Sequence, residues 1–219
     1  SGSVPFSRDS LPMELVTEKD LKPLPLPVQR YLRLAGAVGQ PRIAHFTATW
    51  RGRIRGAADQ SWMKFTAEQQ NFPAESARFF LMDATKSGLP VDVFHAFQHN
   101  RAGMQARLLS LLPLVRSSGP DFDRAETVTL LNDLCLLAPA ALIDPAIRWQ
   151  QVDSSSVRAH YTVGSNTVSA VLRFNEADEL VDFESDDRPV ASADGTRLTP
   201  ARWSTPVREY RSFGTRRAA

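Results

Sequence analysis

The chain has almost no cysteine and no long hydrophobic run. Its 219 residues contain a single cysteine, Cys135, so the disulfide framework of small secreted domains is excluded. No apolar stretch approaches the ~20 residues that a helix needs to cross a bilayer, and no signal-peptide pattern is present. We therefore expect a soluble, cytoplasmic protein, although a leader that had been removed would leave no trace in this sequence.

An excess of charge of one sign is absent as well. The chain has 26 basic and 24 acidic residues, a formal net charge of +2, and no long run of lysine or arginine. A nucleic-acid-binding domain needs basic residues clustered on one face, so we expect no nucleic-acid partner. With 42% hydrophobic and 23% charged residues, the composition is that of an ordinary globular protein. The chain is long enough to bury a core without a metal or a disulfide.

The sequence is rich in segments where apolar and polar residues alternate with period two, which is typical of half-buried antiparallel strands. In residues 45–55, for example, Phe46, Ala48 and Trp50 fall on one face, whereas Arg51 and Arg53 fall on the other. Similar segments lie at 61–69, 78–84, 91–99, 103–109, 147–152, 157–163, 167–174, 179–185 and 202–210. Short turns join most of them, which predicts an antiparallel meander.

Two segments with helical spacing interrupt the strands. Pro27 suits the first turn of a helix that Gly36 ends, and a second helix is expected over residues 124–137, where Asp123 and Glu126 fit a capping box. The predicted fold class is α+β. It is a curved antiparallel sheet of about eight or nine strands, a half-barrel, with two or three covering helices. Residues 1–16 are expected to form a flexible arm, and residues 17–219 a single domain.

Several segments of the sequence resemble those of a bacterial family of unknown function. They are LPLPVQRYLR at 24–33, WMKFTAEQ at 62–69, ETVTLLNDLCLLAPAAL at 126–142 and RWSTP at 202–206. The resemblance extends from about residue 20 to residue 217 and implies no known activity. By analogy of fold, it implies a shape similar to the half-barrels of lipoprotein carriers, which hold acyl chains.

The C-terminus departs from the resembled family. Its members continue by a further strand or two, whereas this chain stops at Ala219. We therefore expect a C-terminus that is either trimmed or naturally divergent. A missing edge strand would leave an open sheet edge, through which a homodimer could form.

The densest polar cluster lies near residue 185. Asp182, Glu184 and Asp186 share one face of a predicted strand, and Arg188 follows them. Three carboxylates that face the same way repel one another unless a cation or solvent intervenes. They could hold a cation or provide a general base, but a solvated strand end explains them more simply.

A second cluster consists of Arg51, Arg53 and Arg55 on one strand face. The guanidinium fork suits a carboxylate or a phosphate, so these residues could bind an anionic ligand. A solvent-facing stripe that pairs with acids on a neighbouring strand is the simpler explanation.

The histidines do not predict a metal site. His95 and His99 have the spacing of a helical ligand pair, but the surrounding apolar residues favour a strand, on which they would lie ~13 Å apart. We expect no metal and no cofactor. His95 is the preferred functional histidine because it lies among apolar residues. Cys135 falls on the apolar stripe of the second helix, which indicates a buried, inert thiol.

Two functions remain open from the sequence. The first is a binding protein for an apolar or amphipathic, lipid-like molecule, with peripheral membrane contact as a further expectation. Arg53 or Arg78 would meet a polar head in the cavity. The other expected ligand-binding residues are Trp50, Trp62, His95 and Trp203.

The alternative is a small-molecule hydrolase or isomerase. His95 or Asp186 would act as the base, and Arg188 would stabilise an oxyanion. An enzyme requires these groups to converge at a pocket, whereas a carrier requires a deep apolar cavity. A partner-binding module, the third hypothesis, would instead show an exposed apolar patch and no cavity.

Overall fold

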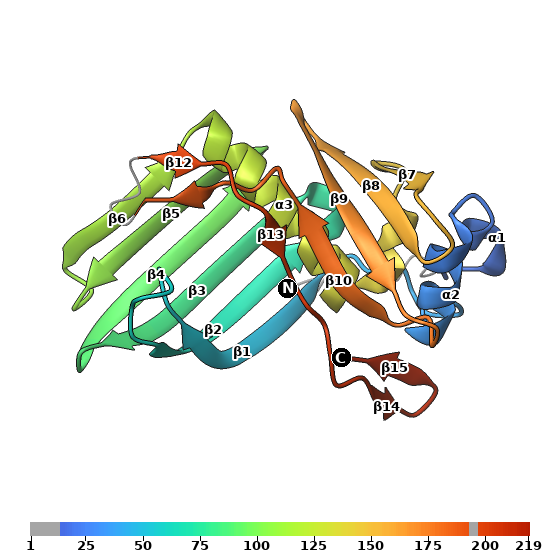
Figure 1. The fold of residues 1–219 in the computed structure, drawn as a ribbon, viewed down its shortest axis with the longest axis horizontal. Helices are drawn as coiled ribbons and strands as arrows, with labels where there is room; N and C mark the ends of the chain where they lie inside the picture. Colours follow the sequence, from blue (N-terminus) through green and yellow to red (C-terminus); the bar gives the residue numbers. More distant parts are fainter. Residues whose placement is uncertain (1–13, 193–196) are drawn as a thin grey trace, which may run out of the picture.

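The computed structural model of the chain describes residues 14–192 and 197–219. A six-stranded antiparallel sheet contains the first strands in chain order (Figure 1). These are β1 (Phe46–Ile54), β2 (Met63–Phe72), β3 (Ala77–Lys86), β4 (Leu89–Gln98), β5 (Arg101–Leu108) and β6 (Leu112–Ser118). A short 3-10 helix, η1 (Pro73–Glu75), lies between β2 and β3.

A second antiparallel sheet has the strand order β13-β10-β9-β8-β7. Its members are β7 (Ile147–Gln151), β8 (Ser156–Val163), β9 (Asn166–Phe174), β10 (Leu180–Ser185) and β13 (Trp203–Ser204). Two small hairpins complete the strands, one formed by β11 (Val190–Ala191) with β12 (Leu198–Thr199) and one by β14 (Arg211–Phe213) with β15 (Arg216–Ala218).

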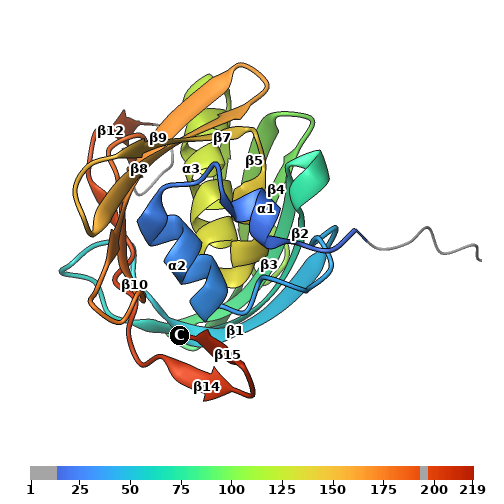
Figure 2. The ribbon, with the colours of Figure 1, turned by 90° about the vertical axis from the view of Figure 1, so that its right-hand side faces the viewer.

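The longest helix, α3 (Pro120–Leu137), lies between the two sheets (Figure 2). Twelve of its eighteen residues are buried, because strands cover it on both sides. Val128, Leu131 and Cys135 belong to the main core, which also includes residues of β8, β9 and β10. The short helices α1 (Glu18–Leu21) and α2 (Leu26–Leu34) close one end of this core, and η2 (Pro139–Ile143) follows α3.

The predicted α+β class is confirmed, with predominantly antiparallel sheets and three α-helices in the described ranges. The prediction of one sheet of eight or nine strands is not confirmed, since the strands divide between two principal sheets. They divide because α3, which lies between β6 and β7 in the chain, is buried between the strands. A half-barrel of the predicted size is therefore replaced by two sheets around a central helix.

Several boundaries differ from the prediction. Strand β6 lies outside the segments that alternation predicts and contains Pro113, but β6 lies at a sheet edge, where a missing N–H group is tolerated. The strand expected at 202–210 is reduced to Trp203–Ser204. Helix α3 begins at Pro120, with Gly119 as its N-cap. The predicted capping box of Asp123 and Glu126 is therefore wrong, and both side chains serve other contacts.

The expected arm lies largely outside the described residues. Of its last residues, Leu15 forms an isolated bridge with Pro41, and Val16 is fully buried in the main core. The N–H group of Val16 also donates a hydrogen bond to the carbonyl oxygen of Gln40. No helix in the described ranges is long and apolar enough to cross a membrane.

Candidate functional site

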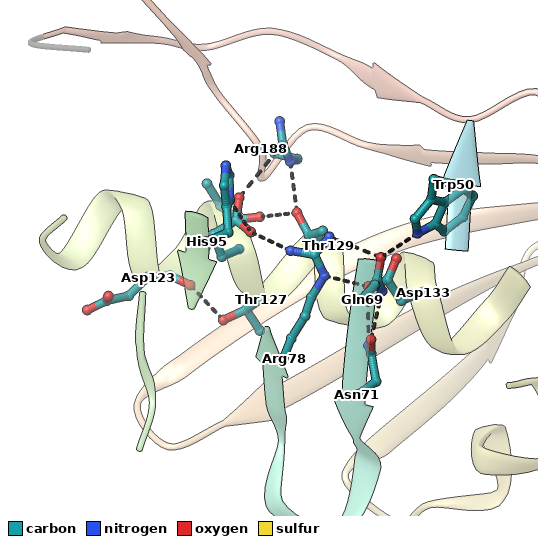
Figure 3. A network of polar contacts seen from close by, with 12 residues as sticks. Trp50, Gln69, Asn71, Arg78, His95, Asp123, Thr127, Thr129, Asp133 and Arg188 are labelled. Carbon is teal, nitrogen blue, oxygen red and sulfur yellow. Dashed lines mark hydrogen bonds and ion pairs between the residues drawn. The ribbon is translucent and has the colours of Figure 1, made fainter. Parts of the chain in front are cut away.

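A network of buried polar side chains lies between the six-stranded sheet and α3 (Figure 3). The sheet contributes Gln69 and Asn71 from β2, Arg78 from β3 and His95 from β4. The helix contributes Glu126, Thr129 and Asp133, whose spacing of three and four residues places them on one helix face. The network is thus built where a polar face of α3 meets polar positions on the inner face of the sheet.

Glu126 is the centre of one half of the network. Its Oε2 lies 3.7 Å from Nη1 of Arg78 and 3.6 Å from Nδ1 of His95. Its Oε1 lies 3.4 Å from Nη2 of Arg188. Arg188 also donates a 3.0 Å hydrogen bond from Nε to Thr129, and its guanidinium lies 4.0 Å from the centre of the Trp203 ring. Glu126 therefore faces two arginines and a histidine from three different segments.

Asp133 is the centre of the other half. Its Oδ2 accepts hydrogen bonds from Arg78 Nε at 2.7 Å, Gln69 Nε2 at 2.7 Å and Asn71 Nδ2 at 3.3 Å. Gln69 in turn accepts a 3.1 Å hydrogen bond from the indole N–H of Trp50. Arg78 therefore bridges the two carboxylates and joins both halves into one network.

The environment shifts the two acids in opposite directions. Burial raises the pKa of Glu126, but the hydrogen-bonding interaction with His95, together with the charges of Arg188 and Arg78, outweighs this effect and lowers the pKa to about 2. Burial raises the pKa of Asp133, and Arg78 offsets only part of that rise. Two carboxylates thus balance two arginines. The network compensates its own charge and leaves no arginine of the pair free for a ligand.

An apolar cavity of about 730 Å³ lies beside this network. Its walls come from the end of α2, the end of α3, β1, and the segment that runs from residue 205 into the β14–β15 hairpin. Most of the walls are apolar, as shown by Ile43, Leu136, Val207 and Phe213. The volume falls in the range of ~300–1,000 Å³ that is usual for small-molecule sites.

Three arginines lie around the cavity. Arg217 forms a 2.6 Å ion pair with Glu179, and Arg216 donates a hydrogen bond to Gln40. Arg208 is exposed and has no ion-pair or hydrogen-bond partner among residues 14–192 and 197–219. Arg208 is therefore the cation at this cavity that an anionic group could bind without breaking an existing pair.

The cavity and the network touch at two indoles. Trp50 lines the cavity and donates to Gln69 of the network. Trp203 stacks beneath Arg188 and donates a 2.9 Å hydrogen bond to Thr205, which lines the cavity. The network therefore fixes two side chains at the boundary of the cavity.

The structure brings some of the expected site residues together. His95, Arg78 and Arg188 share the network, with Trp203 stacked on Arg188 and Trp50 bonded to Gln69. Of the expected ligand-binding residues, Trp50 is the one that lines the large cavity. The expectation that Arg78 meets a polar ligand head conflicts with its engagement by both carboxylates.

Other expected residues lie elsewhere. Arg53 and Trp62 stack on each other, 5.9 Å apart, where β1 and β2 approach their connecting turn. Asp186 is 72% exposed and pairs with Arg202 at 3.0 Å, so it does not converge with His95. Its neighbours Asp182 and Glu184 bond to Ser204 and Arg173, which agrees with a solvated strand end whose partners differ from Arg51, Arg53 and Arg55.

Sequence reasoning missed Glu126, Asp133 and Arg208 as site residues. The signal for the two acids was their spacing of two helical turns, together with polar residues on inward strand positions. For Arg208 no local signal existed, because the cavity is assembled from segments far apart in the sequence.

The described part of the chain contains no group of three or more metal-ligating side chains. His95 lies on β4, as predicted, whereas His99 lies in the following turn with a φ of 53°. The two histidines therefore do not share a face.

Cys135 is expected to be chemically inert in the folded protein. It is fully buried, and burial raises the pKa of its thiol far above the ordinary value. We predict that Ellman's reagent labels no thiol under native conditions and one thiol per chain in denaturant. Rapid labelling of the native protein would contradict the burial of this residue.

A family model described as a family of unknown function, DUF6544, matches residues 14–219. The chain belongs to this family. The match covers α1 through β15, and therefore both sheets, the buried network and the cavity. A comparison with curated proteins finds no match.

Proposed function

We propose that this protein binds an amphipathic small molecule with an apolar body and an anionic head. The observation that carries the proposal is the apolar cavity of about 730 Å³ with Arg208 at its margin, a residue that has no ion-pair or hydrogen-bond partner in the described part of the chain. Removing apolar ligand surface from water would supply most of the affinity, at about 25 cal/mol per Å². Arg208 would select the head by charge and by its planar donor geometry.

The backbone next to Arg208 supports this assignment. Glu209 has a φ of 60°, a backbone conformation that residues other than glycine rarely adopt. This turn directs the chain from β13 into the β14–β15 hairpin, whose residues Phe213 and Arg216 line the cavity. Left-handed residues of this kind are concentrated at ligand clamps and active sites.

The alternative of an acid–base enzyme has weaker support. His95 Nδ1 faces Glu126, which could orient the ring, but Asp186 is distant at the surface. Arg188 already pairs with Glu126 and stacks on Trp203, so stabilising an oxyanion would require it to leave both contacts.

The proposal is tested by native mass spectrometry and by a variant of the cavity wall. Protein purified from cells is expected to carry a bound mass that is released on unfolding. Binding of dodecanoate, an anionic amphiphile, to emptied protein is expected to weaken at least about tenfold in Phe213→Asp, because the new carboxylate enters an apolar wall. Phe213 is 63% exposed, so this change should leave the fold intact.

Phe94→Asp is the matched control, because Phe94 is an exposed phenylalanine that does not line the cavity. Arg208→Glu should weaken the binding of dodecanoate but not that of dodecanol, which has the same apolar body without the charge. If no mass is bound and neither amphiphile binds the wild-type protein, the proposal is wrong.

A further inference from the structure

Three hairpin turns of the six-stranded sheet lie at the same end of the molecule (Figure 1). They join β1 to β2 at residues 55–62, β3 to β4 at 87–88, and β5 to β6 at 109–111. Antiparallel pairing of consecutive strands requires alternate turns to share an end. Residues 51–66, 83–92 and 105–116 together form what we call the hairpin-tip surface.

Large apolar side chains are exposed on the hairpin-tip surface. Leu111 is 80% exposed, Leu112 58% and Trp62 54%. Leu89, Leu109 and Leu114 are each 45% exposed. Single exposed apolar residues are ordinary, but so many at one end of a sheet mark an interaction site.

The backbone of the third turn is unusual for its sequence. Leu109 and Ser110 have φ values of 55° and 59°, a two-residue turn conformation that normally selects asparagine and glycine. A leucine here is sterically disfavoured, and because it is 45% exposed, packing recovers little of that cost. Its presence favours a role for an apolar side chain at the tip.

Basic residues surround these apolar tips. The hairpin-tip surface contains seven basic residues and three acidic ones, although the whole chain has a net charge of only +2. The basic residues are all exposed: Arg51, Arg53, Arg55, Lys64, Lys86, Arg107 and Arg116. One of the acids, Asp92, is engaged by the hydroxyl of Ser110. The surface therefore combines a concentrated positive charge with protruding apolar groups.

We propose that the hairpin-tip surface docks onto an anionic lipid bilayer. Leucines and an interfacial tryptophan would enter the boundary between headgroups and acyl chains, and the arginines and lysines would contact anionic headgroups. Lipid fits this surface better than a folded partner does. The apolar groups project from three separate turns, and mobile lipids can fill the space between them. This proposal goes beyond the cavity function and does not depend on it.

The test measures co-sedimentation of the full chain with vesicles. One set contains phosphatidylcholine alone, and the other also contains phosphatidylglycerol. The wild-type protein is expected to sediment with the anionic vesicles, less so at high salt, and hardly at all with the neutral ones. Failure to sediment with anionic vesicles, or equal sedimentation with both sets, would overturn the proposal.

Two matched pairs of variants locate the surface. Leu111→Asp should reduce partitioning at least about tenfold, whereas Leu26→Asp should not, since Leu26 is 55% exposed at the start of α2. The double variant Lys64→Glu and Lys86→Glu should also reduce partitioning at least about tenfold, because it replaces two attractive contacts with anionic headgroups by two repulsive ones. Arg148→Glu, an exposed charge on β7, should have little effect. Wild-type partitioning by Leu111→Asp would show that the tips do not dock.

Discussion

Replacing Glu126 with glutamine is expected to lower the free energy of unfolding by about 3 kcal/mol or more. The substitution keeps the shape of the side chain but removes the charge that faces Arg188, Arg78 and His95. Arg78 retains Asp133 as a partner. Arg188 keeps its hydrogen bond to Thr129 and its contact with Trp203, but has no other carboxylate within ion-pair distance in the described structure. Urea denaturation followed by circular dichroism measures the change.

Asp133→Asn is the comparison for this result. Asp133 is also buried, but burial raises its pKa, so the folded state holds its charge less favourably. We therefore expect the asparagine variant to lose less stability than the glutamine variant, even though it removes the carboxylate charge that faces Arg78 at 2.7 Å. Equal losses, or a glutamine variant as stable as the wild type, would show that Glu126 is not the charge that the network depends on.

Acid is expected to destabilise the wild-type protein through Glu126. Its folded pKa of about 2 lies below the ordinary value of 4.5, so its contribution is fully present above pH 4.5. That contribution is lost as the pH falls from 4.5 through 2, because the unfolded chain takes up the proton first. The difference between the two pKa values corresponds to about 3 kcal/mol.

The measurement is the free energy of unfolding of the wild type and of Glu126→Gln between pH 7 and pH 2. Exposed acids such as Glu18 and Asp186 titrate in both proteins and cancel in the difference. The difference is expected to shrink as the pH falls below 4.5. Asp133 acts in the opposite sense, since its raised pKa favours the folded state at low pH. A difference that stays constant over this range would contradict the lowered pKa of Glu126.

The sequence alone was sufficient to predict most of the strands and the fold class. Period-two alternation located β1 through β5 and β7 through β10, because less exposed and more exposed residues alternate along most of these strands. In β1, the exposed face of Arg51 and Arg53 lies as the alternation predicts. The bounds of α3 were predicted to within a few residues, since the helical spacing of its apolar residues can be read without knowing which strands pack against it.

Local signals failed where neighbours decide the outcome. Alternation did not predict β6, which contains Pro113; the strand forms because the absence of an N–H group on proline is tolerated at a sheet edge. The segment at 202–210 alternates like a strand, yet only Trp203 and Ser204 pair with β10. The sequence pattern could not divide the strands between two sheets, because that division follows from how α3 is covered on both sides.

The composition of the chain determined that it folds around an ordinary apolar core, without disulfides. Only the tertiary structure decided which charges meet. Glu126 lies 48 residues from Arg78 and 62 from Arg188 in the chain, and no periodicity reports a contact over such distances. The cavity at Arg208 likewise depends on segments from α2 to β15. Alternation records which face of a strand is buried, whereas a site depends on which faces are packed against each other.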